Sequence, residues 1–138
     1  MTHIHRVRVY YEDTDLAGIV YYANYLKFIE RGRSEWVRDL GMDQAQMKAD
    51  GRGVFAVRRV VADYLAPARF DDLLDIRTDY LHHSGARLVL RQSVSRCDTA
   101  LFTAEVTLVC LGNSGRPQPL PREMIEKIGE NPRFKPLV

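Results

Sequence analysis

The sequence predicts an α+β fold in which a mostly antiparallel sheet of about five strands wraps around one long helix. The helix is indicated by apolar residues of 11–41 that recur at three- and four-residue steps, as on one buried face: Tyr22, Tyr25, Leu26, Ile29, Trp36 and Leu40. Most of the remaining chain alternates apolar and polar residues, which is typical of half-buried strands. With 138 residues the chain has the size of one domain, so we expect residues 1–138 to form a single unit.

Two glycines define how the helix packs and where it ends. Gly32 falls on the buried face, where a missing side chain would let the helix axis lie close to a sheet. Gly41 follows the last apolar position and is a natural helix stop. Residues 42–53 are polar and bounded by glycine, and we expect a short helical turn and a loop there.

Strand patterns occupy five stretches, namely residues 5–11, 54–65, 74–80, 87–96 and 102–110. The alternation in the second stretch changes phase at Arg58 and Arg59, which predicts a β-bulge. A hairpin connection is expected at residues 82–85. Near the end of the chain, Pro121 suits the first position of a short helix.

Composition excludes several classes of protein. The net charge of +2 is small and no Lys/Arg-rich run is present, so we expect no nucleic-acid partner. No stretch is apolar for long enough to span a bilayer, and the first residues lack a signal-peptide core, which predicts a soluble cytoplasmic protein. Cys97 and Cys110 lack metal-binding spacing, and His3 and His5 have no matching cluster, so no metal is expected.

The loop before the helix carries the residues best suited to chemistry. Asp13 and Asp15 precede the flexible Gly18, and the helix begins soon after. A helix start exposes unpaired N–H groups with a partial positive charge, which can hold a carbonyl oxygen while a carboxylate attacks or directs water. The alternative is that these acidic residues are ordinary turn or capping residues.

The motifs of this loop and helix resemble a known family. They are YEDTD at residues 11–15, Gly18, VYYANYL at residues 20–26, and YLAPARFDD at residues 64–72. Together they resemble the 4-hydroxybenzoyl-CoA thioesterase-like hotdog proteins, and among these the Tol–Pal-associated acyl-CoA thioesterases. The resemblance implies the hotdog fold and hydrolysis of an acyl-CoA thioester to a free acid and CoA, without a cofactor.

The resemblance also implies roles for individual residues. Asp15 would be the nucleophile or the general base, and the backbone N–H of Tyr22 would bind the thioester carbonyl oxygen. Many Tol–Pal-associated members carry histidine where this chain has Tyr22. Tyrosine keeps the backbone N–H, so the oxyanion role is retained, but the substrate preference of those members cannot be assigned to this chain. Gly18 would belong to the substrate-binding loop.

CoA binding and assembly are implied in the same way. The pantetheine arm would lie along Phe55, Ala56 and Val57, and Arg87 would approach the phosphates. A solvated edge charge is the alternative for Arg87. The family implies a homodimer or homotetramer, with each active site at an interface between two chains.

Two other functions compete with hydrolysis. A hotdog hydratase or dehydratase would need a histidine beside an acidic residue, and no histidine lies in the loop–helix motif. A non-catalytic protein that binds an acyl carrier protein, or acts as a scaffold in envelope maintenance, is compatible with the same motifs. No G-x-S-x-G elbow, P-loop or Rossmann fingerprint is present.

Overall fold

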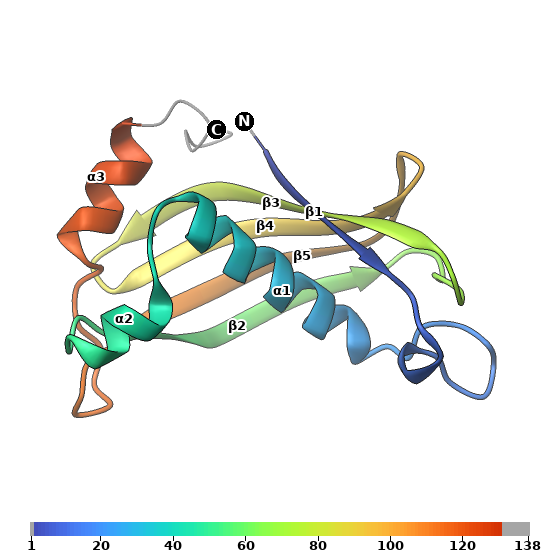
Figure 1. Ribbon diagram of the computed structural model, residues 1–138, viewed down its shortest axis with the longest axis horizontal. Coiled ribbons are helices and arrows are strands. Elements are labelled where there is room, and N and C mark those ends of the chain that lie inside the picture. The colour runs from blue at the N-terminus through green and yellow to red at the C-terminus, as the bar shows by residue number, and fades with distance from the viewer. Residues whose placement is uncertain (1, 131–138) are drawn as a thin grey trace.

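The fold is one five-stranded antiparallel sheet with a long helix across one face, as Figure 1 shows for a computed structural model that describes residues 2–130. The strand order is β1-β3-β4-β5-β2, and the bounds are His3–Arg8 for β1, Val54–Tyr64 for β2, Leu73–Ser84 for β3, Arg87–Arg96 for β4 and Thr99–Leu111 for β5. The helical elements are η1 (Tyr11–Asp13), α1 (Asn24–Asp39), α2 (Gln44–Ala49) and α3 (Arg122–Glu130). The predicted α+β architecture is confirmed, although the predicted span of the domain, 1–138, extends beyond the described residues.

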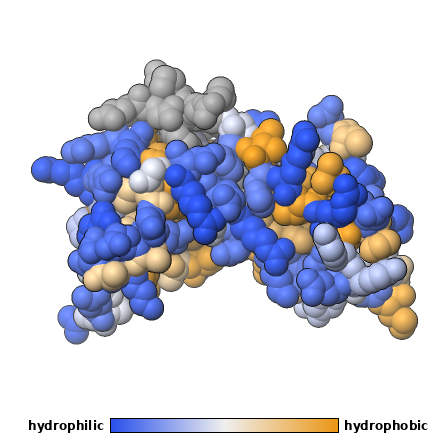
Figure 2. Space-filling model, viewed as in Figure 1, coloured by the Kyte–Doolittle hydropathy of each residue, from blue (hydrophilic) through white to orange (hydrophobic). Residues whose placement is uncertain are grey.

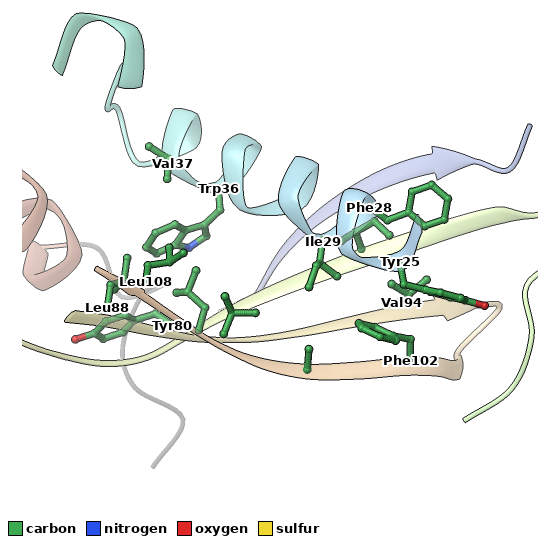
Figure 3. Packing of buried hydrophobic residues seen from close by; sticks show 14 of the residues in the cluster. Tyr25, Phe28, Ile29, Trp36, Val37, Tyr80, Leu88, Val94, Phe102 and Leu108 are labelled. Atoms are coloured by element: carbon green, nitrogen blue, oxygen red, sulfur yellow. The ribbon is translucent and has the colours of Figure 1, made fainter. Parts of the chain in front are cut away.

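Helix α1 packs on the sheet chiefly through β1, β3 and β4. Its buried face includes Tyr25, Ile29 and Trp36, and Figure 3 shows these side chains pointing toward the sheet. Gly32 lies at the closest approach, because a methyl group at this position would stand 2.6 Å from Ile76 Cγ2. The role predicted for Gly32 is therefore confirmed.

Two residues that were expected on this buried face are exposed instead. Tyr22 and Leu26 are 61% and 41% exposed, and Phe28 and Val37 are buried in their place. Tyr22 lies in a turn that ends before the helix begins at Asn24. Leu26 follows the buried Tyr25 directly, and one residue of helix rotates a side chain by about 100°, away from the sheet.

The strands agree with the predicted patterns except at the start of the chain and between β3 and β4. The hairpin connection expected at residues 82–85 was placed too early, because residues 82–84 still pair with β4 and the turn lies at Gly85 and Ala86. The pairing of β2 with β5 shifts register between Val57 and Arg59, which confirms the bulge. Strand β1 ends at Arg8, earlier than predicted, because the Asp13 carboxylate accepts a hydrogen bond of 2.8 Å from the Tyr10 N–H and closes the η1 turn. The face of β5 toward α1 is buried as predicted, through Phe102, Ala104, Val106, Leu108 and Cys110.

Strand β2 forms an edge of the sheet, and on the face that carries α1 several of its side chains are exposed to solvent. Val57, Val60 and Tyr64 pair in register with residues of β5 that are buried under α1, so they belong to the same face of the sheet. These three are nevertheless 36–49% exposed. By contrast, Val9 and Val89 are already buried within one chain.

The C-terminal helix α3 packs beside the end of α1. Met124 and Ile128 are buried, and Lys127 donates a hydrogen bond of 2.9 Å to the Gly41 carbonyl oxygen. The predicted short helix after Pro121 is therefore confirmed. Within residues 2–130, no helix combines the length and the apolar composition needed to cross a bilayer.

Candidate active site

The loop between η1 and α1 folds back on itself and presents Asp15 to solvent. The Asp15 N–H donates to the Ile19 carbonyl oxygen at 2.9 Å, and the Gly18 N–H donates to the Asp15 carbonyl oxygen at 3.0 Å. Gly18 has a φ of +80°, which residues with a side chain rarely adopt, so this position of the turn favours glycine. The Asp15 carboxylate accepts a hydrogen bond of 2.9 Å from the Ala17 N–H and is otherwise open.

The neighbouring Asp13 has a supporting position. Its side chain is buried, and its carboxylate is occupied by the Tyr10 N–H. Its carbonyl oxygen accepts a hydrogen bond of 2.8 Å from the Tyr21 N–H. Of the two acidic residues, Asp13 therefore holds the loop together, and Asp15 is the one available to a ligand.

The backbone at Tyr22 provides a hydrogen-bond donor. The Tyr21 carbonyl oxygen accepts from the Asn24 N–H at 2.8 Å, and the Tyr22 N–H belongs to the same peptide unit. Because the N–H and C=O of a trans peptide point in opposite directions, the Tyr22 N–H is directed away from the first turn of α1. Among residues 2–130, no acceptor forms a hydrogen bond with this N–H.

Asp15 and Tyr22 line the same groove, which has a volume of about 410 Å³. Aromatic side chains form most of its wall, together with the segment that follows β2; the lining residues are Asp15, Ile19, Val20, Tyr21, Tyr22, Tyr25, Tyr64, Leu65, Ala66 and Pro67. In Figure 1 the loop lies at the end of the molecule where α1 begins, and apolar surface is visible at this end in Figure 2. Hollows of similar volume beside residues 38–45 and on the outer face of the sheet lack this loop–helix arrangement.

Two phenols in the groove, those of Tyr21 and Tyr64, have raised pKa values. The neighbouring Tyr22 phenol raises the pKa of Tyr21, and burial and the Asp15 carboxylate raise it further. Burial raises the pKa of Tyr64, and Tyr22 and Tyr25 add to the effect. Both phenols are protonated at neutral pH and can donate hydrogen bonds. The effect of Asp15 on the pKa of Tyr21 shows that the two side chains interact electrostatically.

The wall opposite the helix start is fixed by Asp72 and Tyr25. The Asp72 carboxylate accepts hydrogen bonds from the Arg69 N–H at 2.8 Å and from Arg96 Nη1 at 2.7 Å. Burial alone would raise the pKa of Asp72, but these donors and their charges outweigh it and lower the pKa. The Tyr25 hydroxyl accepts from the Ala68 N–H at 3.0 Å, so the segment after β2 is attached to α1.

The residues expected to bind CoA lie at the other end of β2. Phe55 and Val57 pair with Cys110 and Leu108 on the α1 side of the sheet, near the start of the strand. Tyr64, beside the Asp15 groove, is at its end. One chain therefore does not bring Phe55 or Val57 to the groove.

Arg87 lies on the opposite face of the sheet. Ala56 and Arg87 both pair with Val109, so they share a cross-strand row, and the neighbouring row of Val57, Leu108 and Leu88 faces α1. Since side chains alternate along strands, Ala56 and Arg87 face outward. Contact of Arg87 with the CoA phosphates stays a prediction, as does its alternative of a solvated edge charge.

The sequence did not single out Tyr64 and Tyr25 as residues of the groove. Both were visible as aromatic residues within the motifs, but contact between the two segments depends on tertiary structure. No described histidine lines the groove: His83 pairs with Tyr80 at 2.6 Å and His3 with Asp39 at 2.9 Å, both elsewhere. In residues 2–130 no three His, Cys, Asp or Glu side chains are grouped as a metal site requires.

Comparison with known proteins identifies the family. Residues 9–128 match the family model of the thioesterase-like superfamily. The chain belongs to this superfamily. The predicted resemblance is confirmed further by the acyl-CoA thioester hydrolase YbgC of Escherichia coli O6:H1, which is 40% identical over 121 residues, covering 86% of this chain and 90% of the relative.

Solved structures of thioesterase-like proteins share the fold. A probable thioesterase from Bartonella henselae is 38% identical, with a TM-score of 0.83 over 88% of this chain and 100% of that one. A 4-hydroxybenzoyl-CoA thioesterase variant, solved with 4-hydroxybenzoyl-CoA, has a TM-score of 0.85 at 24% identity, over 91% of this chain and 97% of that one. The hotdog fold predicted for this member of the superfamily is therefore confirmed.

Proposed function

We propose that this chain hydrolyses acyl-CoA thioesters in the groove beside α1, with Asp15 as the reacting carboxylate. One observation carries the proposal: the exposed Asp15 carboxylate and the Tyr22 N–H, which no acceptor of the described residues binds, line the same aromatic groove. The membership of the chain in the thioesterase-like superfamily supports the reaction class, and the name of the E. coli relative supports CoA as the carrier.

The geometry suits attack on a thioester carbonyl. The Tyr22 N–H would bind the carbonyl oxygen, where negative charge develops in the transition state. Asp15 either attacks the carbonyl carbon, giving a mixed anhydride that water then hydrolyses, or removes a proton from the water that attacks. On both routes the C–S bond breaks, CoA leaves as the thiolate, and the acid is released.

Incorporation of ¹⁸O into Asp15 during a single turnover in ¹⁸O-labelled water identifies the nucleophilic route, because water that attacks the acyl carbon of an anhydride would give the same labelling as the general-base route. When Asp15 is the nucleophile, hydrolysis of the anhydride by attack at the Asp15 carboxyl leaves ¹⁸O in the protein, and the released acid carries an oxygen from Asp15. When Asp15 is the base, the label enters the released acid directly and the protein stays unlabelled.

A second copy of the chain would complete the site. Strand β2 is an open edge that bears exposed apolar side chains, and such edges favour pairing with another strand. Antiparallel pairing of two β2 edges about their midpoint would place Phe55 of one chain close to Tyr64 of the other, and Val57 opposite Val61. A homodimer is therefore the proposed active unit, with the pantetheine arm along Phe55–Val57 of the second copy and a homotetramer as a further assembly.

Release of free CoA from a panel of acyl-CoAs tests the function. The panel spans short and long acyl chains and aryl groups, and a thiol reagent detects the product. Turnover above the rate without protein supports hydrolysis. Binding of acyl-CoA without thiol release would support the acyl-carrier-binding or scaffolding alternative instead.

A further inference from the structure

Tyr64 connects the edge strand β2 to the turn that carries the Tyr22 N–H. Its hydroxyl donates a hydrogen bond of 2.9 Å to the Tyr22 carbonyl oxygen. Its ring also packs edge-on against the rings of Tyr22 and Tyr25, with centroids 6.3 and 5.5 Å apart. The turn before α1 is therefore held from outside the loop as well as from within.

The Tyr22 carbonyl takes no part in the hydrogen bonding of α1. In a regular helix it would accept a hydrogen bond from the N–H of Leu26, four residues later. Instead the Leu26 N–H donates to the Ala23 carbonyl oxygen at 3.2 Å. Tyr64 thus supplies the hydrogen bond that turns this carbonyl away from the helix axis.

The two peptide units on either side of Tyr22 are each fixed by one hydrogen bond. Asn24 fixes the unit that contains the Tyr22 N–H, and Tyr64 fixes the unit that follows. Peptide units are planar, so only φ and ψ of Tyr22 relate them. When the second unit is fixed, φ and ψ of Tyr22 can vary less, and so can the direction of the Tyr22 N–H.

We infer that Tyr64 is a positioning residue, whose hydroxyl fixes the direction of the Tyr22 N–H toward the thioester carbonyl oxygen. The inference rests on the function proposed above. Tyr64 contributes to the rate through the backbone of Tyr22, and its hydroxyl is occupied by that carbonyl. The raised pKa of the Tyr64 phenol agrees with this donor role, because burial keeps the hydroxyl protonated.

The substitution Tyr64→Phe removes the hydroxyl and keeps the ring. We expect kcat to fall about tenfold or more, because small displacements of a positioned group reduce rates strongly. KM should change by less than about twofold, since binding of CoA is not altered. Tyr80→Phe is the matched control, because it removes a hydroxyl that bonds His83 at 2.6 Å, at a residue outside the groove, and should leave kcat unchanged.

A vibrational measurement separates positioning from a general effect on the structure. In the Asp15→Asn protein, butanoyl-CoA and benzoyl-CoA with ¹³C-labelled carbonyls are bound and their infrared difference spectra recorded. A well-directed N–H lowers the carbonyl stretching frequency. We expect this lowering to be smaller in Asp15→Asn/Tyr64→Phe and unchanged in Asp15→Asn/Tyr80→Phe.

The outcomes distinguish this inference from the proposed function. An inactive wild-type protein would remove the function itself, and an active Asp15→Asn protein would remove Asp15 as the reacting carboxylate. An active wild-type protein whose kcat and carbonyl frequency are both unaffected by Tyr64→Phe would overturn only the role of Tyr64. A loss of kcat with an unchanged carbonyl frequency, or a rise in KM alone, would likewise overturn positioning through Tyr22.

Discussion

Val57 and Tyr64 project from the same face of β2 but stand at opposite ends of the strand. Val57 pairs with Leu108 and Tyr64 with Phe102, so they lie six positions of β5 apart along the sheet. At about 3.3 Å per residue this is roughly 20 Å. In the proposed homodimer, Val57 of the second copy of the chain would be the one nearer to the groove.

Hybrid dimers should recover activity that each damaged parent lacks. Subunits with Asp15→Asn and subunits with Val57→Asp, co-expressed with different tags, should form hybrids that contain one intact site. An equal, random mixture should reach about a quarter of wild-type activity, because half of the dimers are hybrids with one of two sites working. Light scattering controls for assembly, and an active monomer would contradict the two-chain site.

Substitutions at Tyr22 should separate its backbone from its side chain. Tyr22→Phe keeps the N–H and should retain most activity. Tyr22→Pro removes the N–H and should lower kcat by about 10²–10³-fold, as loss of an oxyanion donor does. Steady-state kinetics measure both, and circular dichroism checks α1 in the Pro variant. A large loss with Phe would show that the phenol takes part.

Asp72 should make stability depend on pH. Its pKa is lowered in the folded protein, so its contribution is present above the unfolded pKa of about 3.9 and is lost as pH falls through the folded pKa. Urea unfolding should therefore show Asp72→Asn less stable than wild type at pH 7, with a gap that narrows in acid. When Arg96 is replaced by Met, the difference in stability that Asp72→Asn makes at pH 7 should be smaller, because the carboxylate has lost the hydrogen bond and the charge of Arg96. A gap independent of pH would contradict the charge-based account.

Gly32 should be intolerant of a side chain. Gly32→Ala would place a methyl group against Ile76 and should lower the free energy of unfolding by about 1–3 kcal/mol, despite the better helix propensity of alanine. Gly129→Ala in α3 is the matched control, since no atom of the described residues lies within 4 Å of a Cβ added there. The control should be neutral or slightly stabilising, and equal effects at both glycines would show that α1 does not approach the sheet as closely as described.

The sequence predicted those features that depend on local pattern. The bulge near Arg58 and the small residue at Gly32 each follow from periodicity, and both are confirmed. The expectation failed at Tyr22 and Leu26, because apolar spacing cannot show where the chain leaves the turn and enters the helix. Phe28 and Leu26 are both apolar and lie two residues apart, so the spacing alone does not show which of them is on the buried face. In the structure it is Phe28.

The arrangement of the site depended on information that the sequence lacks. The motif placed Asp15 near a helix start, but only the fold shows that Asp13 is buried while Asp15 is open. The groove lies at the Tyr64 end of β2, away from Val57, because the loop before α1 packs there, and periodicity does not show this contact. The contact of Tyr64 with Tyr22 joins residues 42 positions apart, and no local signal predicts it.

The kcat of Asp15→Asn tests the proposed mechanism most directly. Asparagine keeps the shape of the side chain but has neither the charge nor the basicity, so kcat should fall by at least about 10³-fold while acyl-CoA still binds. Asp13→Asn, in the supporting position, should lose less. A folded Asp15→Asn protein with a kcat near that of wild type would contradict the assignment of Asp15 as the reacting carboxylate.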